Sequence, residues 1–153
     1  MIKKIFKVIL FISTIVVSIY YANFQGKADS LLKSQSDSWM SMYLKDNTEL
    51  GEVSVPGTHD SAAYKMNGLS VFATPWAKTQ DWNISDQLAT GIRYLDLRVF
   101  DDMTMHHGIA WVGENLEYHL NEICQFLDFH PKDFIFIRLR AEQDGSDPLL
   151  LCL

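Results

Sequence analysis

The pattern of hydrophobic and polar positions predicts four strands separated by helices or long loops. The strands are predicted at residues 52–55, 92–100, 103–106 and 134–139. Each is a short apolar or alternating run bounded by Pro, Gly or acidic residues. Helices are predicted at 83–90 and 115–129, where apolar residues recur at helical spacing before Gly91 and Pro131. This alternation is typical of an α/β fold with a largely parallel sheet.

The first residues of the chain have a different composition from the rest. Lys3, Lys4 and Lys7 precede the apolar run 8–24, and no acidic residue occurs in this segment. Basic residues followed by an apolar run are typical of an export signal or a membrane anchor. We therefore expect a hydrophobic helix within residues 1–28, and a protein that is secreted or extracytoplasmic. Removal and retention of the leader both stay open.

The remainder divides into one domain and a short tail. Residues 29–143 hold all four predicted strands, and an apolar content of 48% is sufficient for a single core. Residues 144–153 show no pattern of a fifth strand, so we expect an irregular tail.

The charge of the chain excludes some classes of partner. The sequence has 13 Lys+Arg against 19 Asp+Glu, and three of the lysines lie within residues 1–24. Nucleic acids and strong electrostatic adsorption to anionic lipid both require clustered cations, so neither is expected. Contact with a membrane would have to be apolar or tethered. Cys124 and Cys152 lack the spacing of metal ligands, and a disulfide between them stays open.

The residues with candidate chemistry follow successive predicted strands. His59-Asp60, Asp96 with Arg98, and His107 fall at or just beyond three strand ends. In a parallel α/β barrel, that end of the strands forms the active-site rim. Two imidazoles can take up and donate a proton, and a guanidinium can stabilise phosphoryl charge, which suits phosphodiester cleavage. The alternatives are a helix cap for Asp60 and a buried ion pair between Asp96 and Arg98.

Three motifs carry a resemblance to a known family. They are SVPGTHDS at 54–61, GIRYLDLR at 91–98 and His106-His107-Gly108. In order and spacing they resemble the X region of bacterial phosphatidylinositol-specific phospholipases C, with a match over about residues 37–143. The resemblance implies a phospholipase-C-like TIM-type (β/α) barrel, of which the chain holds about the first half.

The resemblance also implies roles for individual residues. His59 resembles the general base that deprotonates the inositol 2-hydroxyl, and His107 the general acid that protonates the diacylglycerol oxygen. Asp60 resembles the partner that orients His107. The implied substrate-binding residues are Arg98, Arg140 and Asp96, with Arg98 at the phosphate.

Cofactors and partners follow from the same resemblance. A guanidinium at Arg98 can replace a divalent cation, so metal-independent catalysis without a cofactor is implied. The reaction would release diacylglycerol and a cyclic inositol phosphate. The expected partner is phosphatidylinositol or glycosyl-phosphatidylinositol at a membrane surface. Phe72, Trp76, Trp82 and Trp111 are either lipid-contacting rim residues or ordinary core aromatics.

Three functional hypotheses remain because a full barrel takes about 250 residues. The first is a phospholipase C in fragment or truncated form, in which no residue can be assigned to orient His59. The second is a catalytically inactive, tethered phosphoinositide-binding protein that uses Arg98 and Arg140. The third is an enzyme of the glycerophosphodiester phosphodiesterase type, which would need acidic metal ligands beside its histidines.

Overall fold

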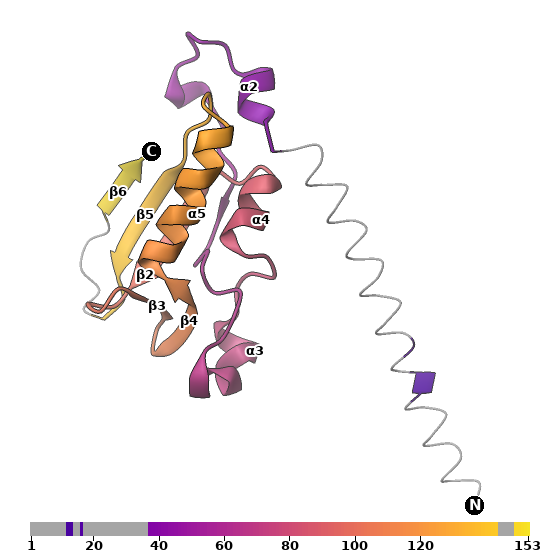
Figure 1. Cartoon of the computed structure of the whole chain (residues 1–153), viewed down its shortest axis with the longest axis vertical. Coiled ribbons are helices and arrows are strands. Elements are labelled where there is room, and N and C mark those ends of the chain that lie inside the picture. Colours follow the sequence, from indigo (N-terminus) through magenta and orange to yellow (C-terminus); the bar gives the residue numbers. More distant parts are fainter. Residues whose placement is uncertain (1–11, 14–15, 17–36, 144–148) are drawn as a thin grey trace, which may run out of the picture.

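The computed structural model describes residues 12–13, 16, 37–143 and 149–153. The helical elements are α2 (Trp39–Tyr43), a 3₁₀ turn (Leu50–Glu52), a 3₁₀ helix (Gly68–Ala73), α3 (Thr74–Ala77), α4 (Ile84–Ala89) and α5 (Leu116–Phe129). The strands are β1 (Gly57–Thr58), β2 (Tyr94–Val99), β3 (Thr104–His107), β4 (Ala110–Asn115), β5 (Phe136–Ala141) and β6 (Leu149–Cys152). Figure 1 shows how they are arranged.

All of these strands belong to one mixed sheet. Its order is β4-β3-β2-β5-β6, and β1 pairs with β2 outside this path. Only the β1–β2 and β2–β5 pairs are parallel, whereas β3, β4 and β6 join antiparallel. The prediction of an α/β fold holds, but that of four strands in a largely parallel sheet is wrong in number and in part of the direction.

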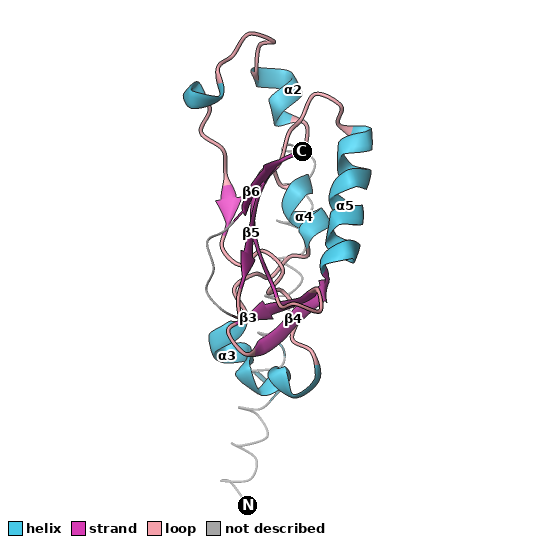
Figure 2. Cartoon of the chain, turned by 90° about the vertical axis from the view of Figure 1, so that its left-hand side faces the viewer, coloured by secondary structure: helices cyan, strands magenta, loops and turns pink. Residues whose placement is uncertain are grey.

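The two longer helices cover one face of the sheet. Leu95, Leu97 and Ile137 point to that face and are buried with Leu88 of α4 and Ile123 of α5. Figure 2 shows α4 and α5 together on the same side of β5. Burial of these apolar side chains supplies the main driving force for folding of the domain.

The other face of β2 and β5 carries charged residues. Strand alternation places Asp96 and Arg98 of β2 on the face opposite Leu95 and Leu97. In the parallel ladder, Asp96 pairs with Arg138 of β5 and Arg98 with Arg140. The face that the helices leave uncovered therefore holds four charged side chains in two neighbouring rows.

Both helices begin where the sequence predicts. The Asn115 side chain accepts a hydrogen bond from the backbone N–H of Tyr118 at 2.8 Å, and Asn83 accepts one from Asp86 at 2.8 Å. Asparagine is a preferred N-cap because its side-chain oxygen satisfies an otherwise unpaired backbone N–H. The predictions for 83–90 and 115–129 are confirmed as α4 and α5.

The first strand lies later in the chain than predicted. Residues 52–55 are not in a strand, and β1 begins at Gly57. The carbonyl oxygen of Pro56 accepts hydrogen bonds from the N–H groups of Arg93 and Tyr94 at 2.9 and 3.1 Å. Although proline has no N–H to donate, its carbonyl joins the chain to the start of β2.

β4 and β6 were not predicted. β4 forms a hairpin with β3 that turns at Gly108, which has a φ of +58°. β6 pairs antiparallel with β5, so the predicted irregular tail at 144–153 is wrong for its last residues. The apolar run after Pro148 was the available signal for β6, and the alternation of Ala110 and Val112 with Trp111 was the signal for β4.

The predicted leader, residues 1–28, lies outside the described residues except at positions 12, 13 and 16. Of the helices that the structure describes, none combines the length and the apolar character that crossing a membrane requires.

Candidate active site

The two histidines are brought together along one edge of β2. β5 pairs with every residue of β2 on one edge, so β1 and β3 share the other. β1 runs with β2 and ends opposite Leu95, whereas β3 pairs with Val99 and runs back toward it. The two strands therefore approach end to end, and His59 meets His107. Their ring centroids are 6.1 Å apart and their planes are nearly perpendicular, at 88°.

The sequence interpretation expected the two histidines to meet at the rim of a parallel barrel. They meet instead because β3 pairs antiparallel with β2. If β3 ran parallel to β2, its last residue would lie beside the end of β2, at Val99. Because β3 runs backward, its last residue lies toward the middle of β2 instead. The predicted proximity of the two rings is observed, although the strand direction assumed for it was wrong.

Arg98 lies close to His59 and to three acidic residues. Its Nη2 is 3.2 Å from Nδ1 of His59 and 3.0 Å from Oδ2 of Asp96. Its Nε is 3.8 Å from Oδ2 of Asp60, and its Nη1 donates to Glu142 at 3.3 Å. The guanidinium is therefore fixed by carboxylates while one edge faces His59.

Asp96 supplies a carboxylate close to His59. Its Oδ2 lies 3.3 Å from Nδ1 of His59, whose side chain is 62% exposed. This nitrogen accepts from Arg98 when it carries no proton and faces Asp96 when protonated. Asp96 is therefore in place to orient His59, a role to which the resemblance assigned no residue of this chain.

Burial and hydrogen bonding act oppositely on Asp96. Burial by itself raises the pKa of this carboxyl, but hydrogen bonds from Arg138, the Asp60 N–H and Arg98 outweigh it. The net effect holds the pKa of Asp96 below its usual value, so the group is a carboxylate at neutral pH.

Asp60 is buried beneath the two rings without a hydrogen-bond partner for either carboxyl oxygen among the described residues. Burial raises its pKa to about 7, against the attraction of Arg98 and His107. Its φ of +46° lies in the left-handed region, where aspartate is tolerated better than most residues. Such strained backbone is often concentrated at functional sites.

His107 is held by a backbone group as well as by Asp60. Its Nδ1 lies 2.8 Å from the carbonyl oxygen of Ala77, at the end of α3, and 3.6 Å from Oδ2 of Asp60. A carbonyl only accepts, so this contact favours the tautomer that carries a proton on Nδ1 and leaves Nε2 as the second nitrogen. The sequence interpretation did not identify Ala77, because a backbone carbonyl has no signature in the sequence.

Two other charged residues at the site were also missed. Glu142, just beyond β5, contacts Arg98 and accepts from the backbone N–H of Gly108 at 3.0 Å. Arg138 donates to Oδ1 of Asp96 at 2.8 Å. Both lie within two residues of Arg140, so strand alternation along β5 was the signal that could have identified them. Arg140 itself lies with its Nε 3.7 Å from Oε2 of Glu142.

An open hollow of about 450 Å³ adjoins these groups. It is lined by Gly57, Thr58, His59, Tyr94, Asp96 and Arg138. A small polar ring bound here would touch His59 directly. Among the described residues, no three His, Cys, Asp or Glu side chains are grouped as ligands for a metal ion.

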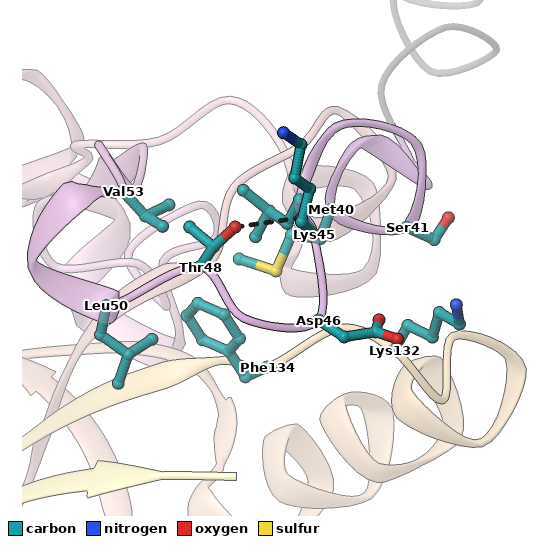
Figure 3. Close-up of a pocket in the computed structure, with 10 residues that line it drawn as sticks. Met40, Ser41, Lys45, Asp46, Thr48, Leu50, Val53, Lys132 and Phe134 are labelled. Atoms are coloured by element: carbon teal, nitrogen blue, oxygen red, sulfur yellow. Dashed lines mark hydrogen bonds between the residues drawn. The ribbon is translucent and has the colours of Figure 1, made fainter.

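A second hollow, of about 300 Å³, lies at the other end of the parallel strands (Figure 3). Val53 precedes β1 and Phe134 precedes β5, whereas His59 and Glu142 follow these strands. Figure 3 shows Lys132 beside Asp46 at its margin and Met40 within it. Its lining contains no histidine, so the candidate chemistry belongs to the opposite end.

Comparisons with known proteins identify relatives of this chain. The family model of the PI-PLC X domain (PI-PLC X 1) matches residues 47–146, well over half of the chain. A 1-phosphatidylinositol phosphodiesterase from Listeria monocytogenes is 39% identical over 109 residues, which are 71% of this chain and 34% of that protein. One from Staphylococcus aureus is 30% identical over 148 residues, covering 94% of this chain and 44% of that protein.

A solved structure shows the same fold. The phosphatidylinositol-specific phospholipase C from Listeria monocytogenes superposes with a TM-score of 0.68 at 39% identity, over 72% of this chain and 40% of that one. The chain thus spans less than half the length of these relatives. A mixed α/β sheet with this similarity fits a fragment of a phospholipase-C-like barrel. The chain therefore belongs to the family of bacterial-type PI-PLC X domains.

Proposed function

We propose that this chain carries the two-histidine part of a phospholipase C site that cleaves phosphatidylinositol. His59 takes the proton of the inositol 2-hydroxyl as its oxygen attacks phosphorus. The bond from phosphorus to the glycerol oxygen breaks, and His107 donates a proton to that oxygen. The products are diacylglycerol and a cyclic inositol phosphate, so atoms and protons balance without an added water.

One observation carries this proposal. The rings of His59 and His107 lie 6.1 Å apart, and the Arg98 guanidinium is 3.2 Å from one of them. A phosphodiester bound between the rings would have a base on one side, an acid on the other and a fixed cation beside its oxygens. A fixed cation stabilises the charge that develops on phosphoryl oxygens in the transition state.

Arg98 also weighs against a metal-dependent mechanism of the glycerophosphodiester type. A divalent cation would need acidic ligands beside the histidines, yet Asp96, Asp60 and Glu142 are each within 3.8 Å of this guanidinium. The positive charge of Arg98 would repel a divalent cation placed among these carboxylates.

The catalytic test uses the whole chain with phosphatidylinositol vesicles and a chelator, with ³¹P NMR to detect the cyclic product. We expect turnover in the chelator, and a loss of about 10²- to 10⁴-fold in His107→Ala. His130→Ala is the matched control, because His130 stacks on Phe126 at the far end of α5. Turnover lost in the chelator would support the glycerophosphodiester alternative, and binding without turnover the non-catalytic one.

Exposed apolar side chains next to His107 support a lipid surface as the site of action. Leu69, Phe72 and Trp76 are 85%, 76% and 79% exposed, and Ile109 in the β3–β4 turn is 97% exposed. Leu69 and Phe72 lie in the 3₁₀ helix that leads into α3, and Trp76 belongs to α3, whose last residue, Ala77, contacts His107. Figure 2 shows α3 beside β3 and β4. Aromatic rings are favoured at membrane interfaces, so we propose that this rim contacts the lipid.

The rim is tested by vesicle sedimentation. Trp76→Ala removes a large exposed ring and should weaken binding to zwitterionic vesicles about tenfold, the expected scale for one buried side chain. Tyr43→Ala is the matched control, since Tyr43 on α2 is 76% exposed at the other end of the sheet. Equal losses in the two variants would contradict the assignment of the rim.

Export is proposed from the leader alone. The three lysines that precede its apolar run, together with that run, support an extracytoplasmic location. Val16→Asp, which places a charge in the apolar run, should retain the protein inside the cell. Fractionation of cells that produce both forms measures this, and an unchanged distribution would contradict export through the leader.

A further inference from the structure

The carboxylate of Asp96 is divided between two sets of partners. Its Oδ2 faces Arg98, the backbone N–H of Asp60 at 3.2 Å and Nδ1 of His59 at 3.3 Å. Its Oδ1 receives a hydrogen bond from Nη1 of Arg138 at 2.8 Å. The side chain is 6% exposed, so these groups and not water determine its orientation.

The register of the sheet explains this contact. Arg138 on β5 lies directly opposite Asp96 on β2, on the face that the helices leave uncovered. Arg140, two residue pairs further along, lies opposite Arg98, and its Nε is 3.7 Å from Oε2 of Glu142. Of the two arginines that β5 contributes to this face, Arg138 is the one that contacts the carboxylate next to His59.

The charges around Arg98 indicate what this contact does. Asp60, Asp96 and Glu142 all lie within 3.8 Å of the Arg98 guanidinium. One cation cannot pair fully with three carboxylates and also face a phosphate. A second guanidinium on the far oxygen of Asp96 takes part of that negative charge. Arg98 then keeps its Nη2 edge toward His59.

We propose that Arg138 is a positioning residue, which holds Oδ1 of Asp96 so that Oδ2 stays aimed at His59 and Arg98. This rests on the proposed function, in which His59 is the base. Without Arg138, the carboxylate can rotate to place both oxygens on Arg98. The paired geometry of a guanidinium with two carboxylate oxygens favours that rotation. His59 would then lose its oriented partner.

Two features separate this role from direct binding of substrate. Arg138 lines the same hollow as His59, so a substrate could reach it. However, its Nη1 already donates to Asp96, and hydrogen bonding by Arg138 is the largest influence that lowers the pKa of that carboxyl. Arg138 therefore acts on Asp96 in the absence of any substrate, and the kinetic readout below separates positioning from binding of substrate.

The test that needs no turnover is a ¹³C NMR titration of the Asp96 carboxyl in the whole chain. The groups facing it are His59, Asp60, Arg98 and Arg138, and only the last is changed. Arg138→Met should raise the midpoint by about one pH unit, the scale expected for loss of a nearby opposite charge. Arg138→Lys should stay near the wild-type midpoint. Lys65→Met, which removes a distant surface charge, should not shift it.

An unchanged midpoint in folded Arg138→Met would overturn the proposal. If that variant does not fold, Arg138→Gln takes its place, because its amide keeps a donor but no charge. It should also raise the midpoint, and the same unchanged value would overturn the proposal.

Kinetics provide the second readout. We expect kcat on phosphatidylinositol to fall about 10- to 100-fold in Arg138→Met with KM nearly constant, as for partners that orient functional groups. A raised KM with unchanged kcat would make Arg138 a substrate-binding residue and overturn the proposal. If the wild-type chain shows no turnover, the proposed function fails by itself, and the titration still decides the role of Arg138.

Discussion

Two arginines of neighbouring sequence differ in how they are surrounded. Arg93 precedes β2 and is fully buried. Its guanidinium donates to Asp133 through Nε and Nη2, at 2.9 and 2.6 Å, and to the backbone carbonyls of Leu88, Ile92 and Asp37. It also lies over the ring of Phe126, 4.5 Å from the centroid. Its partners are mostly backbone groups that neither rotate nor titrate.

Arg98 lies near the other end of the same strand. Its hydrogen bonds described above all go to side chains. Its partners are Asp96, Glu142 and His59, and Asp60 lies nearby with both carboxyl oxygens unpaired. Buried polar groups are usually paired, and an unpaired one reduces stability. The comparison indicates that charges at the start of β2 stabilise the fold, whereas those further along surround the candidate active site.

The largest expected effect is on turnover. Asp60→Asn keeps the shape of the side chain but cannot carry the negative charge that favours a protonated His107. We expect kcat to fall by up to about 10⁴-fold, as when a histidine loses its orienting carboxylate in a serine protease. Asp128→Asn, on the exposed side of α5, is the control. A loss below tenfold would show that the Ala77 carbonyl alone positions His107.

Arg93→Met should act on stability and not on chemistry. Removing one member of a buried ion pair costs about 3–5 kcal/mol, because Asp133 is left as a buried charge. Urea denaturation measures this, and kcat measured well below the new melting temperature should be unchanged. Arg93→Met combined with Asp133→Leu should recover part of the loss. If Asp60→Asn lowered the free energy of unfolding and Arg93→Met did not, the contrast between a stabilising Arg93 cluster and the Arg98 cluster would be contradicted.

The pH dependence of stability gives a smaller effect of defined sign. The pKa of Asp60 is about 7 in the folded chain and about 3.8 as an isolated side chain. Its contribution to stability is therefore fully present below pH 3.8 and is lost as the pH rises through 7. We expect wild type to lose stability relative to Asp60→Asn over that range. A difference that stays flat with pH would contradict the raised pKa.

The smallest effect is expected at an exposed pair. Lys65 and Glu114 lie 2.6 Å apart, with side chains 49% and 40% exposed. Lys65→Met should change the free energy of unfolding by less than about 1 kcal/mol, because water screens such pairs. A loss close to that of Arg93→Met would mean that burial does not distinguish the ion pairs of this molecule.

Local patterns were sufficient for part of the structure. α4 and α5 were predictable because their N-caps Asn83 and Asn115, and their apolar spacing, act within a few residues. β2 was predictable from its alternating residues and β5 from an apolar run. The direction of β3 was predictable too, because a connection of a few residues can join only antiparallel strands. The turn at Asp101–Asp102 was the local signal for a hairpin.

By itself, the sequence determined which residues are candidates for the chemistry: His59, Asp60, Asp96, Arg98 and His107 stand in motifs of recognisable order and spacing. Only the tertiary structure decided how they meet. The end-to-end approach of β1 and β3 places the rings together, and the β2–β5 register sets Arg138 against Asp96. Contacts between distant segments depend on strand direction and register, which residue patterns along one segment do not specify.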